Sequence, residues 1–208
     1  MYVVTGATGN TGSVVAKRLL AAGKKVRAIG RSKERLETLS SSGAQPAVAD
    51  VTDREAVTEA FAGAEAVYVM VPPNMGSNQF RKYQDQVTEA AAAGIERNQV
   101  KYVVALSSFG ADKAAGTGPI VGLHYMEERL TRITGLNCLF LRAGYFMENT
   151  LGQAAAIKQF GVTAGPLKPE LKLPMIATRD IGNFAADALL QLDFLVSPSA
   201  LIIGNSLI

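Results

Sequence analysis

The sequence predicts an α/β protein built on a doubly wound parallel sheet, and three observations lead to this prediction. Short runs rich in β-branched residues alternate with longer stretches whose apolar residues recur at helical spacing. A loop with three glycines follows the first of these runs. The 208 residues, 48% hydrophobic and 19% charged, suffice for one sizeable core, which excludes disordered and fibrous proteins.

Six strands and five connecting helices are expected in strict alternation. Gly23 and Gly94 follow the first and fourth helix, where a residue with positive φ commonly ends a helix, and Asp53 is suited to cap the third. The strands are expected at Tyr2–Thr5, Lys25–Ile29, Gln45–Ala49, Ala64–Val71, Val100–Leu106 and Leu136–Leu141. The helices are expected at Thr11–Ala22, Lys33–Leu39, Asp53–Phe61, Asn78–Ala93 and Gly122–Ile133.

From about residue 144 to residue 208 glycines and prolines break the alternation. One further helix is expected at roughly Arg179–Leu192, begun by Asp180. We expect a single domain over residues 1–208, in which 144–208 add a small substrate-side subdomain that covers the sheet as a lid. The last residues either add a strand at Ala200–Ile203 or leave apolar surface exposed, which would favour a homo-oligomer or a protein partner.

Composition excludes several classes of function. Lys and Arg number 21 against 18 Asp and Glu, and a net charge of +3 is too small for the basic face of a nucleic-acid binder. No apolar run approaches the ~20 residues that span a bilayer, so no membrane partner is expected. Cys138 and His124 are the only residues of their types, so neither a disulfide nor a metal site is expected, and a reducing cytoplasm is the expected location.

Three glycines at a spacing of three separate the first strand from the first helix. Glycines there permit a tight turn, let backbone N–H groups approach a pyrophosphate, and bring the helix close to the strand. At the end of the first strand of a doubly wound sheet, the pattern predicts a dinucleotide site of the Rossmann type; the alternative is a plain turn. The residues assigned to the pyrophosphate are Gly6, Thr8, Gly9, Asn10, Thr11 and Gly12.

The ends of the next strands predict which dinucleotide binds. Arg31 follows the second strand, where its guanidinium suits the 2′-phosphate of NADP better than the ribose hydroxyls of NAD, unless it only begins a solvated helix. At the end of the third strand, Asp50 can accept from the adenine amino group beside Val51, or can cap the next helix. Val71 and Pro72 form a rigid apolar edge beside the ribose and pyrophosphate, or simply end the fourth strand.

The chain resembles the atypical short-chain dehydrogenase/reductase superfamily and, within it, the NmrA-like NAD(P)-binding proteins. The segments that carry the resemblance are Val4–Gly12, Ala105–Ser108 and Leu141–Asn149, and the resemblance extends from Tyr2 to about Leu192. It implies that the last of these segments lines the nicotinamide and substrate side of the pocket. Family members usually continue beyond this length, so the C-terminal substrate subdomain is expected to be incomplete or divergent.

The resemblance also implies candidate substrate residues. Ser107 lies where the superfamily places a substrate-orienting hydroxyl, although turn formation is the simpler alternative. Phe109 is assigned to the same side of the pocket. Tyr145 and Phe146 are expected to form an aromatic wall over the nicotinamide, unless they belong to the core.

The helix after the fifth strand departs from the family's catalytic pattern, a Tyr-x-x-x-Lys pair in which Lys lowers the pKa of Tyr and Tyr supplies a proton. The register that matches Glu128 to the family places His124 at the Lys position and Ile120 at the Tyr position. The other register keeps Tyr125 and Arg129, but Arg stays protonated and lies off the expected face. Catalytic residues are therefore unassigned, with His124 and Tyr125 as candidates.

These features favour an NADPH-dependent oxidoreductase that transfers hydride to a small electrophilic acceptor such as a quinone. Such an acceptor needs little acid from the enzyme, so the missing tyrosine matters less. The alternative is a non-catalytic NADP(H)-binding redox sensor that regulates a protein partner, which the same missing tyrosine supports.

Overall fold

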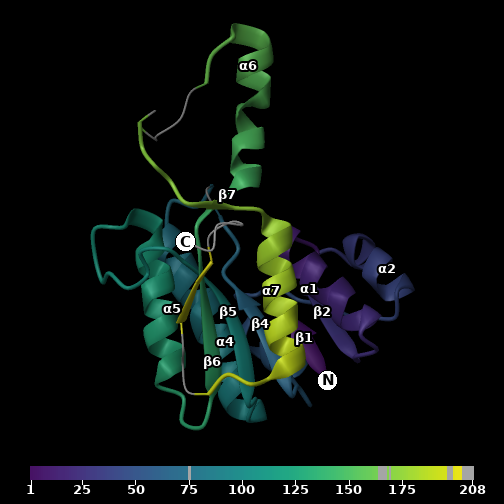
Figure 1. Cartoon of the computed structure of the whole chain (residues 1–208). Helices are drawn as coiled ribbons and strands as arrows, with labels where there is room; N and C mark the ends of the chain where they lie inside the picture. Colours follow the sequence, from purple (N-terminus) through teal and green to yellow (C-terminus); the bar gives the residue numbers. More distant parts are fainter. Residues whose placement is uncertain (75, 164–167, 169, 196–198, 203–208) are drawn as a thin grey trace.

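The computed structural model is a seven-stranded parallel sheet with helices on both faces (Figure 1). The structure describes residues 1–74, 76–163, 168, 170–195 and 199–202. The strand order is β3-β2-β1-β4-β5-β6-β9, and it reverses between β1 and β4, so the predicted doubly wound sheet is confirmed. The strands are β1 (Tyr2–Val4), β2 (Val26–Gly30), β3 (Gln45–Val48), β4 (Ala66–Met70), β5 (Tyr102–Ser108), β6 (Asn137–Ala143) and β9 (Ser199–Ile202).

Two hydrophobic clusters lie on opposite faces of the sheet, because its central strands are apolar on both sides. One face is covered by α1 (Asn10–Ala21), α2 (Lys33–Ser41) and α7 (Thr178–Gln191). The other is covered by α3 (Arg54–Ala60), α4 (Phe80–Asn98) and α5 (Val121–Thr131), the last preceded by the short helix η1 (Gly118–Ile120).

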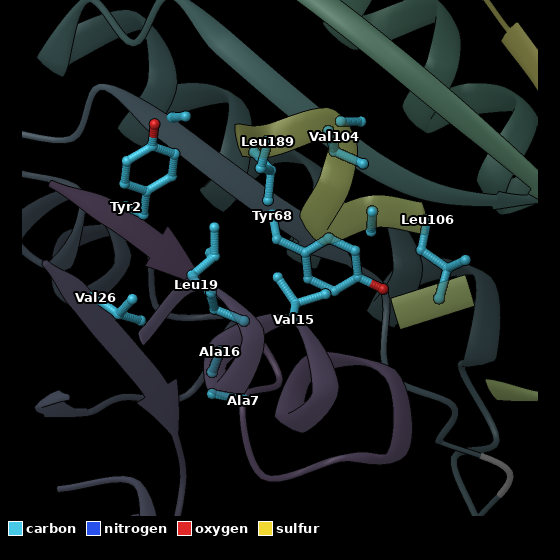
Figure 2. Packing of buried hydrophobic residues seen from close by; sticks show 14 of the residues in the cluster. Tyr2, Ala7, Val15, Ala16, Leu19, Val26, Tyr68, Val104, Leu106 and Leu189 are labelled. Carbon is cyan, nitrogen blue, oxygen red and sulfur yellow. The ribbon is translucent and has the colours of Figure 1, made fainter. Parts of the chain in front are cut away.

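Tyr68 of β4 joins the sheet to the first turn of α1. Its ring is fully buried, and Figure 2 shows it beside Val15, with Leu19 and Leu189 nearby. Its hydroxyl donates a hydrogen bond of 3.0 Å to Thr11 Oγ1, and burial raises the pKa of this hydroxyl. A buried tyrosine needs such a partner, so this bond fixes the start of α1 on the sheet.

Of the two glycines predicted to end a helix, one does so and the other does not. Gly23 ends α1 with a φ of +72°, as predicted. The prediction for Gly94 is wrong, because α4 continues to Asn98 and ends at Gln99, whose φ is +52°. Gly94 is instead required by packing, because a Cβ there would lie 2.8 Å from the ring of Phe61 across the α3–α4 contact.

The starts of α3 and α7 show one correct and one incorrect prediction. Asp53 caps α3, and its carboxylate accepts from the Ala56 N–H at 3.0 Å. Asp180 does not begin α7, which starts at Thr178. Glu148, 30 positions earlier, supplies the cap, because its carboxylate accepts from the Thr178 N–H at 2.9 Å and from its hydroxyl at 2.7 Å. Although burial opposes it, these bonds lower the pKa of Glu148.

The described residues between 144 and 202 contribute both to the main sheet and to a separate arm, and the substrate-side subdomain stays a prediction. α7 packs on α1, and β9 extends the main sheet beside β6, which agrees with the predicted last strand except that Ile203 lies outside the described residues. Only the middle of the segment stands apart, and Figure 1 shows α6 projecting away from the sheet. This arm consists of β7 (Tyr145–Phe146), η2 (Met147–Gln153), α6 (Ala154–Phe160) and β8 (Met175–Ile176).

Several apolar side chains of the arm face solvent. Leu151 and Phe160 are 69% and 67% exposed, and Ile157 is 47% exposed. β7 and β8 pair with each other in a separate two-stranded sheet at the base of the arm. The expected self-association or partner binding stays a prediction.

Candidate functional site

The glycine loop between β1 and α1 is a tight turn on which the helix directly rests. Gly6 adopts a φ of +59°, and the Gly9 N–H donates to its carbonyl at 2.9 Å. A Cβ on Gly12 would lie 2.3 Å from that same Gly6 oxygen, so only glycine allows α1 to begin this close to the turn. The tight turn and the close approach predicted for these glycines are thus confirmed, and their contact with a pyrophosphate stays a prediction.

The first turn of α1 is left open to an anion. Gly9 stands at the N-cap, no side chain caps the helix, and its first turn holds no acidic residue. The initial N–H groups of a helix have no partners within the helix and attract negative charge. The turn and the open helix end therefore fit the pyrophosphate of a dinucleotide.

Side chains around the loop are used mainly to hold it in place. The Arg35 guanidinium donates to the Thr8 carbonyl at 2.9 Å. Asn10 is exposed, whereas the Thr11 side chain turns inward to Tyr68, which leaves only the backbone of Thr11 available to a phosphate. The role of Arg35 was missed, since in sequence it reads only as one of several basic residues.

α7 forms the back of this loop. A Cβ on Gly182 would lie 2.6 Å from Val14 Cβ and 2.9 Å from the Thr11 carbonyl oxygen. Arg18 of α1 and Asp187 of α7 form an ion pair across the same contact. The C-terminal helix therefore supports the start of α1 from behind.

Arg31 and Asp50 lie at neighbouring strand ends. Asp50 Oδ1 accepts from the Thr52 N–H at 2.9 Å and from the Thr52 hydroxyl at 2.8 Å. The N–H bond above all lowers the pKa of Asp50, and the charge of the nearby Arg31 lowers it as well. Both side chains are exposed, so a cation and a carboxylate are presented to the space beyond β2 and β3.

The apolar edge predicted after β4 lies next to the glycine loop. Val71 and Pro72 are half-buried directly after Met70. A Cβ on Gly6 would meet the Met70 sulfur at 2.7 Å, so the end of β4 touches the turn itself. Val51, half-buried after β3, packs with the cluster on the α3–α4 face.

The Ser107 hydroxyl, predicted to orient a substrate, is hydrogen-bonded within the protein. Its side chain is buried, and its hydroxyl donates to Glu127 Oε1 at 2.5 Å. Glu127 also receives two hydrogen bonds from the Arg142 guanidinium, of 3.0 and 2.5 Å, which raise the pKa of Arg142. The hydroxyl is thus held by a partly buried ion pair that the sequence did not reveal, and contact of Ser107 with a substrate stays a prediction.

The predicted aromatic residues gather where β5 and β6 end. The Phe109 N–H donates to the Ala143 carbonyl at 2.9 Å, and the Phe109 side chain is 53% exposed. Tyr145 and Phe146 follow in β7, both half-buried, with the Tyr145 N–H on the Pro174 carbonyl at 2.8 Å. Their contact with a nicotinamide stays a prediction.

His124 is hydrogen-bonded to the protein through one ring nitrogen. Nδ1 lies 2.7 Å from the Ala111 carbonyl, which can only accept, so Nδ1 carries the hydrogen. Nε2 lies 3.8 Å from Glu128. His124 lines a groove of about 430 Å³ together with Glu127 and Arg142.

Tyr125 and Arg129 face α4 instead. The Tyr125 hydroxyl donates to Glu89 at 2.5 Å, and this bond raises its pKa. Arg129 pairs with Glu89 at 3.2 Å and with Glu96 at 3.0 Å. The second register of the catalytic pair therefore serves the contact between two helices.

Other kinds of site have no support in the described part of the chain. It contains no group of three or more His, Cys, Asp or Glu residues that could hold a metal ion. None of its helices has both the length and the apolarity that a bilayer crossing requires. Cys138 is buried, which raises the pKa of its thiol and makes it unreactive.

Known proteins resemble this chain both in sequence and in fold. The chain is 30% identical over 191 residues to the NAD(P)H azoreductase of Xenophilus azovorans, covering 91% of this chain and 63% of that protein. It is 30% identical over 174 residues to an NmrA-like family domain-containing oxidoreductase of Penicillium ochrochloron, covering 75% and 50%. The NADPH complex of an Escherichia coli NADPH-dependent quinone oxidoreductase superposes with a TM-score of 0.82 at 25% identity, covering 99% and 70%.

The chain thus spans less than two thirds of the length of these two curated relatives. A family described as NAD(P)H-binding matches residues 6–191, from the first glycine of the loop to the end of α7. Most of the described sheet and the whole open turn lie inside that match, and the chain therefore belongs to the NAD(P)H-binding family.

Proposed function

We propose that the protein is an NADPH-dependent reductase that passes hydride to a small electrophilic acceptor of the quinone type. The observation that carries the proposal is the open start of α1, resting on the Gly6 turn at the point where the strand order reverses. Ligands of doubly wound sheets bind at this point. The proteins that resemble the chain are named as NAD(P)H-dependent reductases, which favours an enzyme over a redox sensor.

The chain's own residues would divide the work along the cofactor. The N–H groups of Asn10, Thr11 and Gly12 hold the pyrophosphate, because the helix end is uncapped. Arg31 holds the 2′-phosphate, and Asp50 accepts from the adenine amino group. When bound, the cofactor supplies a hydride at the nicotinamide ring.

The acceptor side favours chemistry that asks little of the enzyme. Ile120 lies beside Gly110 at the end of β5, where the family's pattern would place a proton-donating tyrosine. A quinone that takes up one hydride and one proton from water becomes a hydroquinone without such a group. Phe109 and Tyr145 offer aromatic surface to a flat acceptor, and a cytoplasmic location stays a prediction that rests on the lone Cys138.

The reaction itself gives the first prediction. Purified protein should oxidise NADPH at a rate that depends on added quinone, followed by the near-ultraviolet absorbance of NADPH. The product should be the hydroquinone in equal amount. Saturable NADPH binding without turnover across quinones, azo compounds and other aromatic acceptors would contradict a reductase and favour the sensor.

The choice of cofactor gives the second prediction. Arg31→Ala should weaken NADPH binding roughly tenfold to thirtyfold, since a charge-assisted hydrogen bond contributes about 1.5–2 kcal/mol. NADH binding should change little, because NADH has no 2′-phosphate. Lys33→Ala, which removes another exposed cation two positions away, is the matched control and should leave both affinities unchanged. Equal losses for NADPH and NADH would exclude a phosphate contact by Arg31.

A further inference from the structure

Tyr83 lies near the strand ends that carry Arg31 and Asp50, and nothing described so far gives its hydroxyl a role. It lies one helical turn before Val87 on α4, so both side chains lie on the same face of that helix. Val87 lines a small cavity with Val51 and Met70, the residues beside the ends of β3 and β4. Tyr83, one turn nearer the start of the helix, therefore lies above this cavity toward the edge where the strands end.

Charges on that edge act on the Tyr83 hydroxyl. Burial raises its pKa, the charge of Asp50 raises it further, and the charge of Arg31 lowers it. The phenol is thus within electrostatic reach of both proposed contacts of the adenosine half. Its side chain is half-buried, so part of its surface is accessible to another group.

No role in the protein's own packing accounts for this hydroxyl. Within the ranges that the structure describes, it makes no hydrogen bond, in contrast to Tyr68 and Tyr125, whose hydroxyls both have partners. A tyrosine that is half-buried usually places its polar end toward water or a ligand.

We propose that Tyr83 is a cofactor-binding residue whose ring packs against the adenine of NADPH, opposite the surface formed by Val51. The inference rests on the proposed cofactor site, but not on turnover. The adenine would then lie over Val51, with Asp50 at its amino edge and Tyr83 along its face. Aromatic rings stack on any base, so the contact contributes affinity without distinguishing NADPH from NADH.

Affinity for 2′,5′-ADP tests this contact, because that fragment carries the adenine and the 2′-phosphate but cannot be oxidised. Tyr83→Ala should weaken its binding roughly tenfold in calorimetry, and Tyr83→Phe should stay within about twofold of the unchanged protein. NADH should lose as much affinity as NADPH, in contrast to Arg31→Ala. Unchanged affinity in a folded Tyr83→Ala variant would overturn the proposal, as would a loss confined to NADPH.

The chain contains no tryptophan, which allows a direct readout. Tyr83→Trp places a single indole at the site, and stacking on adenine should quench its fluorescence as 2′,5′-ADP is added. Tyr102→Trp is the matched control, because Tyr102 begins β5 at the opposite edge and packs edge-on against Phe194. No quenching at position 83, or equal quenching at both positions, would overturn the contact.

These outcomes separate the inference from the proposed reaction. Loss of 2′,5′-ADP binding in Tyr83→Ala supports the adenine contact even if no acceptor is reduced. Robust quinone reduction with unaltered binding in the same variant would support the reductase and refute the role of Tyr83.

Discussion

Gly12→Ala is expected to abolish most cofactor binding and to destabilise the fold. The added Cβ would lie 2.3 Å from the Gly6 carbonyl oxygen, which is backbone and cannot turn aside. Alanine gains about 1 kcal/mol over glycine inside a helix, but overpacking of this kind costs about 1–3 kcal/mol or more. The turn and the helix start must move apart, and the N–H groups then no longer converge on one phosphate.

NADPH affinity, measured by calorimetry, should fall by roughly a hundredfold, equivalent to about 2.7 kcal/mol. The matched control is Gly152→Ala in η2, where a Cβ would meet no atom within 4 Å. That variant should bind NADPH as the unchanged protein does. A Gly12→Ala variant with native affinity would mean that the helix start does not need this close approach.

Glu127→Ala should cause the largest loss of stability without touching the glycine loop. The change would leave the Arg142 guanidinium and the buried Ser107 hydroxyl without their shared acceptor. Breaking a fully buried pair costs about 3–5 kcal/mol and an exposed pair less than about 1. Because the Arg142 side chain is 26% exposed, we expect about 2–3 kcal/mol, measured as the free energy of unfolding in urea.

Glu128→Ala is the control for this prediction. Glu128 is exposed, and its contacts with His124 and Arg132 are both 3.8 Å long. Its removal should change the free energy of unfolding by no more than about 0.5 kcal/mol. A Glu127→Ala variant as stable as Glu128→Ala would show that the buried pair contributes nothing to the fold.

Local patterns predicted most of the fold and the shape of the cofactor loop. The alternation of apolar runs with helical stretches predicted six strands and five helices close to their observed bounds, except at the end of α4, because the central strands are buried on both faces. The spacing of Gly6, Gly9 and Gly12 predicted a close approach that the structure contains. The resemblance to NmrA-like proteins is confirmed by the relatives found.

Interactions between distant residues could not be predicted in the same way. Gly94 resembled a helix end in sequence, but its small size is required by Phe61, which follows the last residue of α3. Asp180 was the nearest candidate cap, yet Glu148 reaches α7 from the arm. The Ser107 hydroxyl looked available because nothing local revealed its acceptor, Glu127, 20 positions later.

The support that α7 gives to α1 has a consequence for how the protein is made. The glycine loop is synthesised before α7, and the pairing of Arg18 with Asp187 joins positions that are 169 residues apart. The α7 surface that supports the loop thus exists only after nearly the whole described chain has been synthesised. A nascent chain that contains every glycine of the loop but not yet α7 would lack this support, so dinucleotide binding should begin only once α7 has been synthesised.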